Sequence, residues 1–373
     1  MRNSLLLTTL LFLFSCSETK KEATVVYKAG FKAIHAVDKS RIYKPNSDTT
    51  DYLHYRPLDL DIWYPSTAVE RDTNLLFRNI LGLLDKRANY YTASDAGNGL
   101  SQQIAQLFCT GFKCSDTTKL LNFKTASFQN AAAAGSKFPL VVYLSSFNGM
   151  SYENYALFED LAKRGFVVLS ISSIGRFPGD MTMKSEDLQE QVNDAIASVD
   201  VLKQNSNIDF TKIGIIGYSW GGLSGSILAG KIPNVTCLVS LDGSEFHHYG
   251  QVKDENKDFD SIRYSQDFKE LRLSIPYLRL ESFPLNSKDK EDSVYNFSEK
   301  LAGDKQIFKV DSTQHEDFGC LSIIVKESGN CKVNQQYNTI SKLTISFLEE
   351  HLKNKRSFLQ TVGQEMNKTI TTK

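Results

Sequence analysis

The sequence has no excess of either charge. Its 43 lysines and arginines balance 43 aspartates and glutamates, and charges of one sign form no long run. A neutral chain has no net field that would attract nucleic acid or an anionic membrane surface. We therefore expect no nucleic-acid partner.

Internal repeats are also missing, and low-complexity tracts are absent between the polar ends of the chain. These two absences exclude solenoids and other repeat architectures. The 373 residues, of which 41% are hydrophobic, have an ordinary globular composition. This length suffices for one large α/β core or two smaller domains.

The N-terminal hydrophobic run is too short to cross a bilayer. It extends from Leu5 to Phe14 after Arg2, which is typical of a signal-peptide core. Cys16 follows a small residue at its end and resembles the lipobox of a bacterial lipoprotein; an ordinary secretion signal is the alternative. The resemblance implies that Cys16 is lipidated and anchors an extracytoplasmic protein to a membrane of the bacterial cell envelope.

Cysteines are few, and five follow the lipobox. In an oxidising compartment, those nearest in sequence form disulfides, so we predict the bridges Cys109–Cys114 and Cys320–Cys331. Cys237 lies in the apolar run VTCLVSL and is predicted to be a buried free thiol. No histidine lies at zinc-ligand spacing from either pair, and we expect neither a metal nor a cofactor.

These signals divide the chain into four parts. Residues 1–16 form the signal peptide and lipobox, 17–26 a polar tether, 27–355 one compact domain and 356–373 a polar C-terminal tail. Within the domain, residues from about 67 to 136 look helical in pieces and contain no strong strand. We interpret them as an insertion that either covers the substrate cleft as a lid or packs locally.

Strand-like and helix-like segments alternate through the rest of the domain. Residues 55–65 have the period-2 pattern of a strand, and an apolar run at 138–146 begins the core. The later strands are predicted at 166–172, 213–216, 235–242, 274–282 and 305–310, and the helices at 151–165, 185–204, 222–230 and 338–353. Such alternation predicts an α/β fold, a mostly parallel sheet with helices on both faces.

One serine lies in the run GYSWG (217–221), between the strand 213–216 and the helix 222–230. This is the pattern of a nucleophile elbow, because larger side chains two residues from a strained Ser219 would collide with neighbouring backbone. The turn raises the serine hydroxyl above the sheet and aims the Trp220 amide at a developing oxyanion. A glycine-rich turn with an idle serine is the alternative.

A serine needs a base to become a good nucleophile. Of the six histidines, His315 follows the strand KQIFKV in a polar turn, which is the usual position of a hydrolase histidine, and we predict that it is the base. Two of the others precede the core strands, two lie in a loop that could approach the site, and one lies in the closing helix: His35, His54, His247, His248 and His351.

The base needs an acid to orient it, and the residues leave two candidates open. Asp242 ends the strand after the elbow helix, and Glu281 ends the next strand. Many hydrolases place the acid on the later strand, so topology alone slightly favours Glu281.

Several motifs, taken in order, resemble the plasma-type platelet-activating factor acetylhydrolases and their bacterial, dienelactone hydrolase-like relatives. They are RPLDLDIWYP, FPLVVYLSSFNGMSYENYALFEDLAKRGFVV, GYSWGG, LDGS, IPYLRLES and DSTQHEDF. The match runs discontinuously from about residue 28 to 350 and covers most of the chain after the signal peptide. The resemblance implies the α/β-hydrolase fold and a catalytic triad of Ser219, Asp242 and His315. It therefore makes Asp242 the predicted acid, with Glu281 as the alternative.

One motif departs from this family. Its members usually have a His-Gly pair after the strand that here ends in YLSSFNG, whereas this chain has Ser146 and Phe147. The first oxyanion donor is then the amide of Trp220, and the second is the amide of Phe147 or of Asn148. The change also narrows the pocket, so the preferred acyl group can differ from that of the family.

The residues and the resemblance together predict a serine ester hydrolase that acts on small-molecule or lipid-like acyl esters. A carbohydrate-acyl esterase or a dienelactone hydrolase-like enzyme would use the same triad with another leaving group. The missing His-Gly pair keeps a third hypothesis open, a catalytically silent surface lipoprotein that binds a ligand through the cleft.

Overall fold

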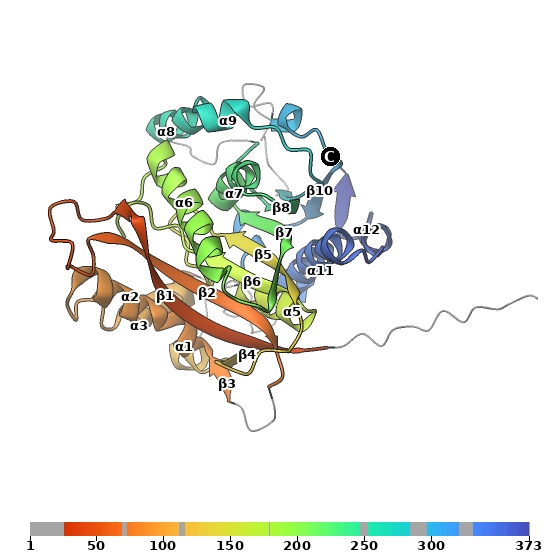
Figure 1. The fold of residues 1–373 in the computed structure, drawn as a ribbon. Helices are drawn as coiled ribbons and strands as arrows, with labels where there is room; N and C mark the ends of the chain where they lie inside the picture. The colour runs from red at the N-terminus through yellow and green to blue at the C-terminus, as the bar shows by residue number, and fades with distance from the viewer. Residues whose placement is uncertain are drawn as a thin grey trace, which may run out of the picture.

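The computed structural model describes residues 26–68, 73–111, 116–178, 180–246, 253–283, 297–320 and 331–372. In these residues the strands form one sheet in the order β11-β10-β9-β8-β7-β5-β6-β2-β1-β4-β3 (Figure 1). The strands are β1 Lys28–Ile42, β2 Tyr55–Ser66, β3 Asn74–Leu76, β4 Lys124–Gln129, β5 Phe138–Leu144, β6 Val167–Ile171, β7 Ile208–Tyr218, β8 Val235–Leu241, β9 Tyr277–Phe283, β10 Lys305–Asp311 and β11 Ile370–Thr372.

Helices fill most of the connections between these strands. They are α1 Phe77–Leu81, α2 Leu83–Thr92, α3 Leu100–Gly111, α4 Thr117–Leu121, α5 Tyr155–Lys163, α6 Ser185–Leu202, α7 Trp220–Lys231, α8 Lys253–Arg263, α9 Gln266–Glu270, α11 Cys331–Lys353 and α12 Phe358–Glu365, with the 3-10 turns η1 Phe297–Lys300 and η2 His315–Phe318.

The centre of the sheet is parallel. Strands β6, β5, β7, β8, β9 and β10 pair in parallel, and β2 joins β6 in the antiparallel direction. Every residue of β5 is buried, as expected of a central strand covered on both faces. The predicted α/β fold with a mostly parallel sheet is therefore confirmed.

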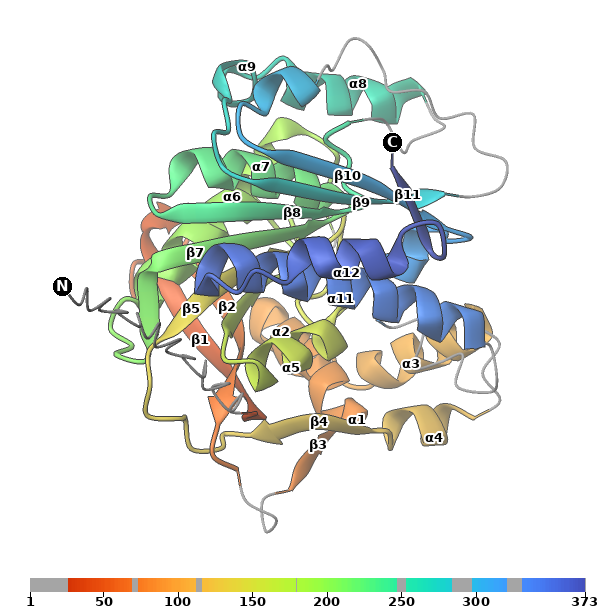
Figure 2. The ribbon, with the colours of Figure 1, turned by 90° about the vertical axis from the view of Figure 1, so that its right-hand side faces the viewer.

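Two hydrophobic clusters lie on opposite faces of this sheet. Val141 and Tyr143 of β5 belong to one cluster, which also contains residues of α5, α11 and α12. Leu140 and Val142 belong to the other, together with residues of α6 and α7. The alternation follows from the period-2 geometry of a strand, and Figure 2 shows α11 and α12 in front of the sheet with α7 behind it.

A long N-terminal arm extends the sheet beyond the parallel core. Strand β1 pairs along β2 in the antiparallel direction, and β4 pairs with β1. The insertion at 67–136 contains the expected helical pieces, α1 to α4, but it also contains β3 and β4. Strand β4 was not predicted because KTASFQ contains only two residues that favour strands, Thr125 and Phe128, and has polar ends.

The prediction of a polar tail over residues 356–373 is wrong. This segment contains α12, which packs on α11, and β11, which pairs with β10 and forms one edge of the sheet. The Phe358 side chain is only 2% exposed and lies against Phe308 and Phe347. The segment therefore belongs to the domain, held by the buried Phe358 ring and by Ile370, which is also fully buried.

The cysteine predictions have different outcomes. Cys237 is a buried free thiol, as predicted. Cys320 is also a buried free thiol, whose sulfur donates to the Glu153 carbonyl at 3.3 Å, so the predicted bridge to Cys331 is wrong. Cys109 is buried, but Cys114 lies outside the described residues, and their pairing stays a prediction.

The N-terminal predictions also stay untested. Cys16, the signal peptide and most of the tether lie outside the described residues. Over the part of the chain that the structure covers, no helix combines the length and the hydropathy needed to cross a bilayer.

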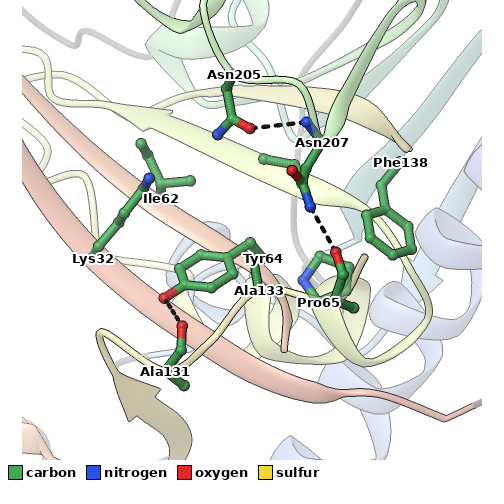
Figure 3. Close-up of a pocket in the computed structure, with 11 residues that line it drawn as sticks. Lys32, Ile62, Tyr64, Pro65, Ala131, Ala133, Phe138, Asn205 and Asn207 are labelled. Carbon is green, nitrogen blue, oxygen red and sulfur yellow. Dashed lines mark hydrogen bonds between the residues drawn. The ribbon is translucent and has the colours of Figure 1, made fainter. Parts of the chain in front are cut away.

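A small cavity of about 150 Å³ lies where the parallel strands begin (Figure 3). Phe138 and Val167, the first residues of β5 and β6, line it together with Lys32, Tyr64 and Asn207. The Tyr64 hydroxyl and the side-chain amide of Asn207 donate to the carbonyls of Ala131 and Ala134 at 2.7 and 2.6 Å. This cavity lies at the edge opposite to the one at which the predicted serine is found.

The packing of α12 predicts that two neighbouring side chains, Phe358 and Leu359, contribute very differently to stability. Phe358→Ala should lower the free energy of unfolding by about 3–5 kcal/mol, because it empties a buried aromatic position. Leu359→Ala is the matched control, since Leu359 is 73% exposed, and it should stay within about 0.5 kcal/mol of wild type. Urea unfolding measures both, and equal stabilities would contradict the packing of α12.

Candidate active site

Ser219 lies at the turn from β7 to α7, in a strained backbone conformation. Its φ of 55° is in a region that residues with side chains rarely adopt. Two hydrogen bonds hold it there: its amide donates to the Leu241 carbonyl at 3.0 Å, and its carbonyl accepts from the Ser244 amide at 2.9 Å. The serine is thus clamped to the end of β8 and the loop that follows it.

Two glycines make this turn possible. A Cβ at Gly217 would collide with the carbonyl of Gly221, and a Cβ at Gly221 would collide with the carbonyl of Leu144 at the end of β5. With hydrogens at both positions, the first turn of α7 approaches the ends of β5 and β7 closely. This is the physical reason for the spacing of the GYSWG motif.

The structure brings His315 between Ser219 and Asp242. His315 begins η2 after β10, and its Nε2 lies 2.8 Å from the serine Oγ. Its Nδ1 lies 2.7 Å from Oδ2 of Asp242. The Tyr218 hydroxyl donates to the His315 carbonyl at 2.9 Å, so the residue before the serine also holds the histidine turn.

Asp242 follows β8 and is 1% exposed. Its Oδ1 accepts a hydrogen bond from the Ser282 amide at 2.8 Å, which orients the carboxylate. Burial would raise its pKa, but the hydrogen bond and charge of His315, together with the charge of Arg279, hold the pKa below the ordinary value. The carboxylate is therefore ionised at neutral pH.

Glu281, the alternative acid, has a different partner. Its Oε2 accepts from Nε of Arg279 at 2.9 Å, and this arginine is fully buried. Arg279 also contacts Oε1 of Glu245 at 3.1 Å. The structure therefore sets Asp242, and not Glu281, beside the histidine, and it uses Glu281 to neutralise a buried cation.

Comparisons with known proteins agree with this arrangement of the sheet. A family model described as the alpha/beta hydrolase fold matches residues 139–303. A solved structure, the ferulic acid esterase from Streptomyces cinnamoneus, matches with a TM-score of 0.62 at 19% sequence identity, over 89% of this chain and 92% of that chain. The chain has the α/β-hydrolase fold. Comparison with curated proteins by sequence finds no significant match, and the resemblance to platelet-activating factor acetylhydrolases stays a prediction.

Two backbone segments lie beside Ser219 in this α/β-hydrolase fold: the first turn of α7 and the 146–149 turn. Trp220 is the first residue of α7, and its amide has no acceptor within the helix by geometry. The Phe147 ring packs edge-on against the Trp220 ring, with centroids 5.7 Å apart, which puts the 146–149 turn beside the elbow. The Asn148 amide donates to Sδ of Met181 at 3.1 Å, whereas no described residue accepts from the Phe147 amide.

The other histidines have no contact with the serine in the described ranges. His35 pairs with Asp59, and His54 lies against Ser47. His351 packs on the Phe347 ring, and burial lowers its pKa, so it is less solvated than its place in the closing helix suggests. His247 and His248 lie outside the described residues. Among the residues that the structure describes, no group of three or more acidic, histidine or cysteine side chains could hold a metal.

Sequence reasoning missed one buried acid near the site, Glu153. It belongs to the run SYENYALF, where a single glutamate before a helix gives no signal of its own. Its carboxylate accepts from the amide and hydroxyl of Ser146 and from the hydroxyl of Tyr143. Burial raises its pKa to about 7, although the hydrogen bonds from Ser146 and Tyr143 and the charge of His315 lower it.

This pKa predicts a pH dependence of stability. The titratable groups that face Glu153 are Tyr143, Tyr218, His315 and Cys320. Because the pKa of Glu153 is raised from the ordinary 4.5 to about 7, its neutral form stabilises the fold below pH 4.5. That contribution is lost as the pH rises through 7.

Glu153→Gln removes this titration. The free energy of unfolding of the variant, minus that of wild type, should therefore increase from pH 5 to pH 8, by at most about 3 kcal/mol. Urea unfolding at several pH values measures the difference. A difference that stays constant over this range would contradict the raised pKa.

Proposed function

We propose that this protein is a serine ester hydrolase that uses Ser219, His315 and Asp242 as its catalytic triad. The observation that carries the proposal is the continuous chain of contacts from the Ser219 hydroxyl through His315 to the buried Asp242, at 2.8 and 2.7 Å. The strained serine at the start of α7 and the ionised state of Asp242 support it.

In the proposed reaction, His315 Nε2 takes the hydroxyl proton while Ser219 Oγ attacks the ester carbonyl carbon. The carbonyl electrons move to its oxygen, and the tetrahedral intermediate collapses as the C–O bond to the alcohol breaks. His315 donates its proton to that alcohol. Water, deprotonated by His315, then releases the acid from Ser219, and Asp242 orients the imidazole and stabilises its charged form throughout.

The amides of Trp220 and Phe147 are the proposed donors to the oxyanion. Trp220 is supported by its place at the N-terminus of α7, whose dipole also favours negative charge. Phe147 is favoured over Asn148, because the Asn148 amide already donates to Met181.

The substrate is proposed to be a small or lipid-like acyl ester. A second candidate substrate is an ester of a carbohydrate-linked or aromatic acid. The structural similarity to a ferulic acid esterase, over 89% of the chain, favours it. The edge-on pair of Phe147 and Trp220 beside the serine would suit a flat acyl group as well as a short one. Acetyl, longer acyl and feruloyl esters, compared by kcat/KM, distinguish these candidates.

The location is also a proposal. The run from Leu5 to Phe14 and the lipobox-like Cys16 support an extracytoplasmic lipoprotein held in the cell envelope by its N-terminal lipid. Release of the protein into the soluble fraction by Cys16→Ser tests the anchor.

Labelling with a fluorophosphonate tests the nucleophile without knowledge of the substrate. The label should map to Ser219 by mass spectrometry, and His315→Ala should abolish it, because the serine loses its base. Ser219→Ala should lower turnover by several orders of magnitude. A folded wild-type protein that takes no label would favour a silent ligand-binding protein instead.

A pair of acid variants tests the choice of Asp242. Asp242→Asn should lower kcat by about 10⁴-fold, because the amide no longer holds the productive histidine tautomer. Glu281→Gln keeps the shape beside Arg279 and should stay within about tenfold of wild type. Steady-state kinetics on p-nitrophenyl acetate measure both, and a large loss in Glu281→Gln alone would reverse the assignment.

A further inference from the structure

A buried carboxylate joins two loops that the proposed reaction needs. Glu153 is 7% exposed and lies two residues before α5. It is close to the 146–149 turn, which carries the Phe147 amide, and to the end of η2, the 3-10 turn that begins with His315. No step of the proposed mechanism uses this group.

Its side chain grips the turn at the residue before Phe147. Oε1 accepts from the Ser146 amide at 2.8 Å, and Oε2 accepts from the Ser146 hydroxyl at 2.6 Å. Two bonds from one carboxylate to the amide and side chain of one residue fix the orientation of that residue. The next amide along the chain belongs to Phe147, so its direction follows from this grip.

The carboxylate is itself held in place by a hydrogen bond from the sheet and by contact with the turn. The Tyr143 hydroxyl, on the buried strand β5, donates to Oε1 at 2.9 Å. The turn is closed by a hydrogen bond from the Gly149 amide to the Ser146 carbonyl at 2.8 Å. A Cβ at Gly149 would lie against the Glu153 carboxylate, so the turn and the acid are packed in direct contact.

The backbone around Glu153 holds the histidine loop. The Glu153 carbonyl accepts from the Cys320 amide at 3.1 Å. The side-chain amide of Asn154 donates to the Phe318 carbonyl at 2.9 Å, at the end of the 3-10 turn that begins with His315. One dipeptide therefore links the position of the base to the position of the oxyanion turn.

We propose that Glu153 is a positioning residue that holds the Phe147 amide in register with Ser219 and His315. This inference rests on the proposed serine hydrolase function and on Phe147 as an oxyanion donor. The proposed role depends on the reach of the carboxylate to Ser146. It therefore differs from a role in which a second negative charge stabilises the protonated His315.

Two conservative variants separate reach from charge. Glu153→Asp keeps the charge but withdraws the carboxylate by one bond, about 1.5 Å, so the grip on Ser146 is lost. Glu153→Gln keeps the reach and loses the charge. Glu159→Asp is the matched control: Glu159 is also a buried acid with a raised pKa, and it binds Ser127 on β4, outside the proposed site.

Hydrolysis of p-nitrophenyl acetate and inhibition by an aryl trifluoromethyl ketone, whose serine adduct carries an oxyanion, are the readouts. We expect Glu153→Asp to lower kcat about 100-fold with KM within about threefold, and to weaken the inhibitor by a similar factor. Glu153→Gln should stay within about tenfold, and Glu159→Asp should match wild type.

The opposite pattern would overturn the inference. A loss confined to Glu153→Gln would assign the effect to charge, and wild-type kcat in both variants would mean that Glu153 has no role in positioning. If Glu153→Asp does not fold, Ser146→Ala decides: we expect kcat about tenfold lower with KM unchanged, and wild-type kcat overturns the proposal. A wild-type protein that neither hydrolyses the ester nor takes label on Ser219 would overturn the proposed function together with the inference.

Discussion

The close approach of the first turn of α7 to the ends of β5 and β7 is the constraint on which the site depends. Gly217 and Gly221 permit it, because a side chain at either position would collide with a backbone carbonyl. The approach places Ser219 at a positive φ, directly before the first turn of α7. It also sets the end of β5, and thereby the 146–149 turn, against the elbow.

Buried charge is the second organising feature at this edge of the sheet. Asp242, Glu245, Glu281 and Glu153 lie within one region, and each would be costly there without partners. Arg279 neutralises two of them, His315 pairs with Asp242, and Glu153 receives donors from Ser146 and Tyr143. Burial raises the pKa of Glu153 to about 7, and its hydrogen-bond donors from Ser146 and Tyr143 are uncharged.

Much of the fold could be predicted because its signals are local. The buried strand FPLVVYL, the helix after it and the glycine pattern around Ser219 each identify an element from a few adjacent residues. Strand β4 and the C-terminal α12–β11 segment could not be predicted in this way. Their sequences are short and mostly polar. They are ordered by pairing with β1 and β10 and by the buried side chains of Phe358 and Ile370.

The sequence by itself determined the strand–turn–helix that strains Ser219, since that turn needs only small residues at Gly217 and Gly221. Local pattern left the acid open between Asp242 and Glu281, and the second donor between Phe147 and Asn148. Only the tertiary structure sets Asp242 beside His315 and leaves Phe147 as the favoured donor, because parallel strands bring residues far apart in the chain to one edge. There, Arg279 pairs with Glu281, and the Asn148 amide donates to Met181. Glu153 links the 146–149 turn to the segment that begins with His315, and no sequence motif connects the two.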